Sequence, residues 1–141
     1  MILVGNQRGG AKNLALHLMK DENDHVELHE LRGFASNDLM GALNETYAIS
    51  RGTRCKQFLY SLSFNPPKDE AVDTETFEKA INEAEERLGL AGQPRAIVFH
   101  EKEGRRHAHA VWSRIDIEQM KAIQMSYDHK TLNTLSRDLF L

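Results

Sequence analysis

The sequence predicts an α+β domain with a central, mostly antiparallel β-sheet and flanking helices. The chain has 141 residues, a length that suits one domain with one hydrophobic core. Stretches with the apolar spacing of strands alternate with helical stretches, and several strands then follow one another near the C-terminal end. Such a mixture of crossovers and hairpins is typical of an α+β fold. We therefore expect residues 1–141 to form a single domain.

Apolar spacing predicts the first three elements. Residues 1–4 (MILV) are a short apolar run that indicates a buried strand, and the glycines of the following GNQRGG favour a loop. Positions 14, 15, 18 and 19 are apolar at helical spacing, which predicts a helix from Ala11 to about Lys20. The alternating VELHEL that begins at Val26 predicts the next strand.

Caps and turns delimit the elements in the middle of the chain. The expected elements are a helix capped by Ser36 or Asn37 and ending near Gly52, a strand at 57–64, and a helix that begins at Asp73 or Thr74 and stops by Gly89 and Gly92. Side chains that accept backbone N–H bonds favour the two helix starts. The strand is rich in β-forming residues, and Asn-Pro-Pro after it predicts a turn.

The C-terminal third is expected to begin with a β-hairpin. Residues 96–100 (AIVFH), a turn through EKEGRR and residues 107–115 give its two strands. A last strand at about 122–126 and a helix from about Lys130 to the end follow. Because that helical pattern is still running at Leu141, we expect the chain to be the N-terminal part of a longer protein.

Composition narrows the class of protein. The chain has a net charge of −3, but basic residues gather at 51–56 and 102–114. These two basic runs could form a basic surface on an acidic body, or they could simply be solvated charged segments. A lone Cys55 excludes an internal disulfide and a cysteine-rich zinc site. The sequence contains no membrane-spanning segment or secretory signal, which predicts a cytoplasmic protein.

Three histidines are the strongest chemical signal. His107 and His109 are two apart on a predicted strand and so share one face, while His100 ends the partner strand of the hairpin. Three neutral imidazoles that converge suit a divalent ion with open positions for substrate oxygens. The alternative is a surface strand whose histidines contact only water. Glu101 could orient one imidazole or could simply be a turn residue.

The stretch HEKEGRRHAHAVWSRID resembles the third motif of conjugative relaxases, the plasmid mobilisation (Mob and Vir type) branch of the HUH endonuclease superfamily. His100, His107 and His109 have the spacing of its metal ligands. The resemblance implies a nuclease that nicks one DNA strand at a transfer origin with Mg²⁺ or Mn²⁺ and remains bound to the 5′ phosphate. It also implies single-stranded origin-of-transfer DNA, accessory relaxosome proteins and a type IV secretion coupling protein as partners.

The resemblance also suggests which residue attacks the DNA. This branch usually has a tyrosine on the first helix, where this sequence has His17. Some mobilisation relaxases use histidine, and imidazole is largely neutral near pH 7 and needs no strong base. His17 is therefore the candidate nucleophile; the alternative is a DNA-binding module that has lost its nucleophile. Ser63, or otherwise Ser61, resembles the second-motif serine near the DNA backbone, and either could instead be a solvent-facing strand residue.

Basic residues give candidate DNA contacts. Arg8 follows the first strand in the Gly-rich loop, and others surround the predicted metal site or precede the third strand. The full set is Arg8, Arg51, Arg54, Lys56, Arg105, Arg106 and Arg114. Trp112 is expected on the face opposite the two strand histidines, where core packing is favoured over base stacking. A three-histidine enzyme for a small molecule would instead need a deep apolar pocket, of which the sequence gives little sign.

Overall fold

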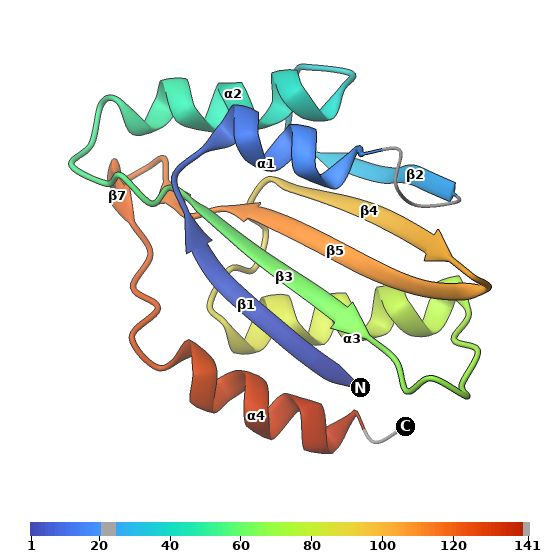
Figure 1. The fold of residues 1–141 in the computed structure, drawn as a ribbon. Coiled ribbons are helices and arrows are strands. Elements are labelled where there is room, and N and C mark those ends of the chain that lie inside the picture. Colours follow the sequence, from blue (N-terminus) through green and yellow to red (C-terminus); the bar gives the residue numbers. More distant parts are fainter. Residues whose placement is uncertain (21–24, 140–141) are drawn as a thin grey trace.

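A computed structural model describes residues 1–20 and 25–139 and has a five-stranded sheet between two pairs of helices (Figure 1). Its elements in chain order are β1 (Ile2–Arg8), α1 (Ala11–Leu18), β2 (His25–Arg32), α2 (Leu39–Ser50), β3 (Leu59–Asn65), α3 (Thr74–Arg87), β4 (Arg95–Lys102), β5 (Arg105–Ser113), β6 (Ile115–Asp116), β7 (Lys121–Ala122) and α4 (Asp128–Asp138). The α+β prediction is confirmed. None of the helices in the described ranges has the length and apolarity to cross a bilayer.

The sheet places the predicted hairpin at its centre. Its strand order is β1-β3-β5-β4-β2, and every neighbouring pair is antiparallel. The hairpin turn is tighter than the expected 101–106, because Lys102 and Arg105 still pair and only Glu103 and Gly104 lie between them. Both have positive φ, 53° and 75°, as two-residue turns that match the strand twist require.

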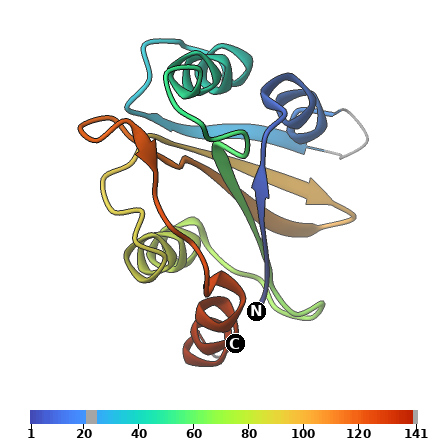
Figure 2. The same ribbon diagram turned by 90° about the vertical axis from the view of Figure 1, so that its left-hand side faces the viewer.

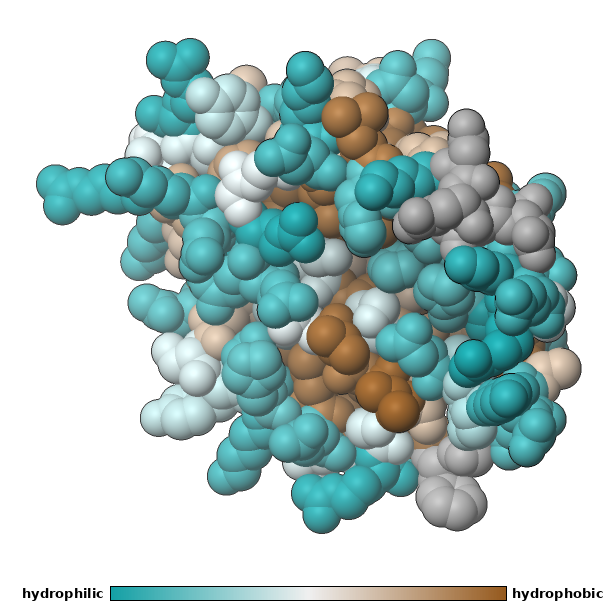
Figure 3. Space-filling model, in the orientation of Figure 1, coloured by the Kyte–Doolittle hydropathy of each residue, from teal (hydrophilic) through white to brown (hydrophobic). Residues whose placement is uncertain are grey.

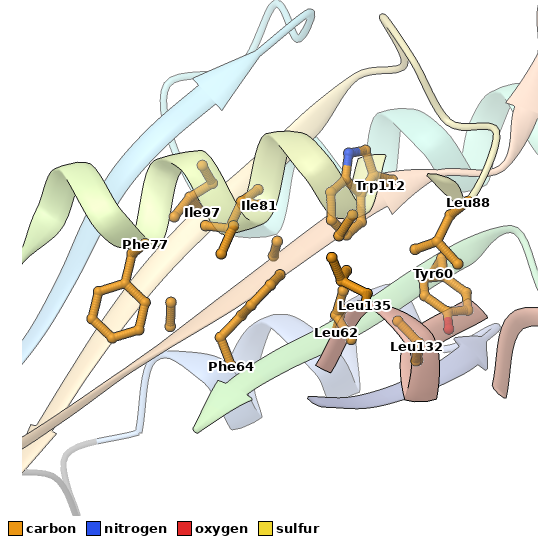
Figure 4. Packing of buried hydrophobic residues seen from close by; sticks show 14 of the residues in the cluster. Tyr60, Leu62, Phe64, Phe77, Ile81, Leu88, Ile97, Trp112, Leu132 and Leu135 are labelled. Carbon is orange, nitrogen blue, oxygen red and sulfur yellow. The ribbon is translucent and has the colours of Figure 1, made fainter. Parts of the chain in front are cut away.

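Helices cover the two faces of the sheet differently (Figures 1 and 2). We call the face under α1 and α2 the site face, and the face under α3 and α4 the core face. On the core face, Tyr60, Phe64 and Trp112 from the middle strands are fully buried against residues of α3 and α4 (Figure 4). Trp112 therefore packs in the core, as its position in the strand predicted.

A polar network closes one edge of the core face. The Glu85 carboxylate accepts hydrogen bonds from Trp112 Nε1 at 2.9 Å, Arg95 Nη1 at 3.0 Å and Arg32 Nη2 at 2.6 Å. Burial alone would raise the pKa of Glu85, but the bonds from Trp112 and Arg32 bring it below its usual value. Glu85 is thus held as an anion inside the protein with its partners in place.

The N-terminal strand and the second helix depart from expectation. β1 runs through Arg8, so most of the predicted GNQRGG loop is strand, and Ile2 and Val4 are 69% and 50% exposed. The prediction of a buried strand was wrong because β1 is an edge strand whose site-face side is only partly covered. Asp38, and not Ser36 or Asn37, caps α2: its Oδ1 accepts from the Gly41 N–H at 2.6 Å.

Other boundaries vary in accuracy. Asp73 caps α3 as predicted, accepting from the Thr76 N–H at 2.8 Å. The last strand is only the two residues of β7, and α4 ends at Asp138 with Leu139 as its C-cap, so the expected helix to the end of the chain is not observed within the described residues. Short two-residue pairings and frayed helix ends carry little sequence signal. The last two predicted helical residues, 140–141, lie outside the described part.

Candidate active site

Three histidines gather on the site face of the two central strands. Alternation along β5 places His107 and His109 on this face, and His100 of β4 pairs directly with His107. The three ring centroids lie 4.5–5.2 Å apart. One ligand nitrogen from each ring can be chosen so that all lie within 4.8 Å of one another. The hairpin therefore brings together the three residues that the sequence predicted as a metal site.

The end of α1 holds one of these rings in place. His100 is 4% exposed, and its Nε2 lies 2.5 Å from the carbonyl oxygen of Leu18, the last residue of α1. A carbonyl at a helix end has no partner within the helix and accepts bonds from other groups. This contact at the helix end fixes the orientation of the His100 ring beside the other two imidazoles. The donor set thus fits a divalent ion.

Burial keeps the imidazoles of His107 and His109 neutral. Burial, with smaller contributions from the neighbouring His100, His107 and His17, lowers the pKa of His109 from 6.5 to about 3. Burial also lowers the pKa of His107, with His100 and Arg105 acting in the same direction. Neutral rings at pH 7 can offer lone pairs to a cation without first losing a proton.

A cleft of about 140 Å³ opens beside the histidines and is lined by α1, β1, β3 and β5. Ser63 stands directly opposite His109 in the β3–β5 pairing, and Ser61 lies two residues along on the same side. His17 on the exposed side of α1 lines this cleft together with His109 and Arg8. His17, which is the candidate nucleophile, therefore borders one cleft with His109 and the two serines.

Two asparagines at this site were missed by the sequence analysis. Asn6 lines the cleft from β1, and Asn65 Nδ2 donates to Ser63 Oγ at 3.0 Å and to the Ile2 carbonyl at 3.2 Å. If the strand predicted at residues 1–4 had been continued to Arg8, the alternation Val4-Asn6-Arg8 would have placed Asn6 on the same face as Arg8. Asn65 was read only as part of the Asn-Pro-Pro turn, and its bond to Ser63 spans two residues on the same side of β3.

The sequence comparison identifies the family. A model of the MobA/VirD2-like relaxase nuclease domain matches residues 15–141, which include every residue of the histidine cluster and His17. The chain belongs to the MobA/VirD2-like relaxases. Among curated proteins, the search found no match. The relaxase family, the antiparallel α+β fold and the histidine cluster agree with the HUH interpretation of the sequence.

Tyrosines do not line the relaxase cleft. Tyr60 points to the core face, where its hydroxyl donates to Asp128 Oδ2 at 2.9 Å, and burial with that carboxylate raises its pKa. Tyr47 lies on α2 and Tyr127 precedes α4; of the described residues lining the cleft, none is a tyrosine. Of the candidate nucleophiles in the described residues, His17 therefore lines the cleft and the tyrosines do not.

Three predicted site residues lie elsewhere. Glu101 follows His100 on β4, so its side chain projects to the opposite face of the sheet. Arg106 also lies on the core-face side, with its guanidinium 4.1 Å from the Phe99 ring centroid and Nη1 2.8 Å from Thr74 Oγ1. Arg114 is 7% exposed and donates to the carbonyls of residues 57 and 123. None of these three side chains lines the cleft, and the contacts described for Arg106 and Arg114 are with other parts of the fold.

The remaining predicted DNA contacts fall in three places. Arg8 lines the cleft, and Arg105 lies with His107 around a second hollow of about 260 Å³ at the hairpin end. Arg51, Arg54 and Lys56 are exposed around a separate groove beyond the end of α2. Basic side chains therefore flank the histidine cluster on both sides along the sheet.

Proposed function

We propose that this relaxase domain nicks one strand of DNA at an origin of transfer, with a divalent ion held by His100, His107 and His109, and stays joined to the 5′ phosphate through His17. One observation carries the proposal: His17 of α1 borders the same cleft as His109, one of the three clustered histidines of the hairpin. A DNA-binding module without catalysis would not need a candidate nucleophile beside a possible metal site, so this observation does not support the non-catalytic alternative.

Binding of a phosphate is the first task of the cleft. A divalent ion such as Mg²⁺ or Mn²⁺ would offset the negative charge that builds on the scissile phosphate. Arg8 adds a fixed positive charge to the same cleft. Ser63 already accepts a hydrogen bond from Asn65, which leaves its own hydroxyl hydrogen free to point at a phosphate oxygen. These groups orient the phosphorus towards α1.

His17 then attacks. The lone pair of its imidazole forms a bond to phosphorus while the bond from phosphorus to the 3′ oxygen breaks. The departing 3′ oxygen takes up a proton, and the imidazolium that formed loses one, so the products are a 3′ hydroxyl and a 5′ phosphoramidate. A phosphoramidate keeps enough energy for the reverse attack by a 3′ hydroxyl, which is the rejoining step that strand transfer requires.

Capture from a random pool tests this function without knowledge of the origin sequence. The protein is incubated with single-stranded DNA of random sequence and Mn²⁺, and denatured protein is then collected and its attached DNA sequenced. We expect covalent adducts enriched in one sequence, and none with EDTA. His17→Ala should abolish the adduct, whereas His129→Ala, an exposed histidine on α4, should keep it.

The adduct itself identifies the attacking atom. A phosphorus–nitrogen bond breaks in mild acid, whereas a phosphotyrosine survives it. An acid-stable adduct, or one that persists in His17→Ala, contradicts His17 as nucleophile. DNA binding that survives replacement of all three cluster histidines, with no cleavage under any metal, supports the non-catalytic alternative. On the strength of family membership, we also propose a bacterial cytoplasmic setting with accessory relaxosome proteins and a secretion coupling protein as partners.

A further inference from the structure

The helix α2 stops at the end of the molecule that lies on the left in Figure 1 and faces the viewer in Figure 2, and a groove lies beside that helix end. The groove has a volume of about 550 Å³ and lies between the end of α2 and the segment that leads into β3. Gly9, at the junction of β1 and α1, forms part of its wall. The predicted metal site contributes nothing to this groove, so it is a distinct site.

An aromatic ring is exposed in the groove. Tyr47 of α2 is 48% exposed, and its ring centroid lies 5.7 Å from that of Phe58, which is 2% exposed. Phe58 therefore supports one side of the Tyr47 ring from within the core, and the remaining surface of the ring is open. Within the described residues the Tyr47 hydroxyl has no hydrogen-bond partner. An exposed, supported ring of this kind offers a flat stacking surface.

Unpaired positive charge surrounds that ring. Arg51, Arg54 and Lys56 are all exposed in the groove, and none forms an ion pair with any acid that the structure describes. Arg51 follows α2 directly, where a cation favours the helix dipole. Arg54 and Lys56 lie beyond the helix and have no such role. Three cations without acidic partners would attract a chain that carries negative charges at regular intervals.

The groove and the active-site cleft meet at neighbouring residues of the chain. Arg8 lines the cleft and the next residue, Gly9, lines the groove. The junction is tight: a Cβ on Gly9 would lie 2.5 Å from the Lys56 carbonyl oxygen. From Ser63 to the start of β3 at Leu59 the distance is about 13 Å at the usual rise per residue. A flexible chain in the cleft therefore reaches the groove within a few units.

We propose that this groove binds an unpaired nucleotide of the substrate strand, with its base stacked on Tyr47 and its phosphate held by Arg54 and Lys56. Aromatic rings interleaved with cations are the combination by which proteins hold single-stranded DNA without reading its sequence. The proposal rests on the proposed nicking function only in making this strand the one that is cut. The groove would fix the strand at a set distance from His17.

Binding of fluorescein-labelled dT12 in EDTA tests the groove without cleavage. If a base stacks on this ring, Tyr47→Ala should raise the dissociation constant about 5- to 100-fold, while the dissociation constant of Tyr47→Phe should stay close to that of wild type. Tyr127→Ala, which removes an even more exposed tyrosine from another surface, should bind like wild type. Arg54→Ala and Lys56→Ala should each reduce the slope of log affinity against log salt by about 0.7, whereas Tyr47→Ala leaves it unchanged.

The outcomes separate the groove from the nicking reaction. Equal affinity of Tyr47→Ala and wild type, or equal losses in Tyr47→Ala and Tyr127→Ala, would overturn the groove even if random-pool capture gives adducts. Weakened dT12 binding confined to the groove variants would support it even if no protein forms an adduct, and the failure would then fall on the nicking proposal alone. Circular dichroism of each variant shows that a loss of binding does not come from unfolding.

Discussion

The two faces of the sheet use the same strands for opposite purposes. On the core face, β3 and β5 contribute Tyr60, Phe64 and Trp112, all fully buried under α3 and α4. On the site face, the neighbouring positions of the same strands are Ser61, Ser63, His107 and His109, which are only partly buried. The visible surface is mostly hydrophilic, with a few hydrophobic side chains among the hydrophilic ones (Figure 3). Ile2 and Val4 of β1 are among the exposed hydrophobic residues.

The difference comes from how far the helices reach. α1 is only eight residues long, and together with α2 it buries an apolar cluster that includes Val98 and Val111. Past these apolar positions, the residues that β3 and β5 place on the site face are polar, namely Ser61, Ser63, His107 and His109. Because each strand position belongs to one face, a substitution should affect stability or chemistry according to its parity along the strand.

The largest effect on stability is expected at the core face. Trp112→Ala should lower the free energy of unfolding by about 3–5 kcal/mol, because it leaves a cavity and removes a hydrogen bond to Glu85. Trp112→Phe keeps most of the volume and should cost less. Urea denaturation followed by circular dichroism measures both. Metal affinity of the folded fraction should stay unchanged, and a large change in it would break the separation of the faces.

The histidine cluster should show the reverse pattern. His109→Gln should reduce Mn²⁺ affinity by more than the 10- to 100-fold typical of residues that merely orient a ligand, because it removes a ligand itself, and adduct formation should fall with it. The free energy of unfolding without metal should change little at pH 7.5. Isothermal titration with Mn²⁺ gives the affinity, with His129→Gln as the control. Unaltered Mn²⁺ binding in His109→Gln would exclude this residue as a ligand.

Acid should weaken the metal-free fold through the same residue. In the unfolded chain His109 has its ordinary pKa near 6.5, but burial lowers the pKa to about 3 in the fold. Between these values the unfolded chain binds the extra proton, so the free energy of unfolding falls as the pH drops below about 6.5. Urea titrations in EDTA at pH 7.5 and 5 should show a smaller loss for His109→Gln than for wild type. Equal losses would contradict a buried, neutral His109.

The sequence predicted the chemistry of the site face better than its boundaries. Period-two alternation was enough to place His107 and His109 together, and the hairpin supplied His100. The same alternation already implied that Glu101 projects away from His100, since neighbouring strand residues face opposite sides. The prediction failed there because Glu101 was assigned to a turn that proved to be only two residues long.

Charged residues were harder to place, because their partners are distant in sequence. Arg106 meets Glu27, Thr74 and Phe99, and Arg114 binds the carbonyls of residues 57 and 123. Nothing local distinguishes these arginines from Arg105, which stays exposed. The cap of α2 was missed by one residue for a related reason, since Ser36, Asn37 and Asp38 are all good caps and only the fold selects among them.

The smallest effect is expected when a single hydroxyl is removed from the site face. Ser63→Ala removes a group that accepts from Asn65 and that could donate to a phosphate, so adduct formation should slow about 5- to 10-fold, the equivalent of one hydrogen bond of about 1 kcal/mol. Ser61 lines the same cleft but does not accept that bond, so Ser61→Ala should slow adduct formation less. Single-turnover rates at saturating Mn²⁺ measure both. A larger loss in Ser61→Ala would move the motif serine to position 61, two residues along the same side of β3.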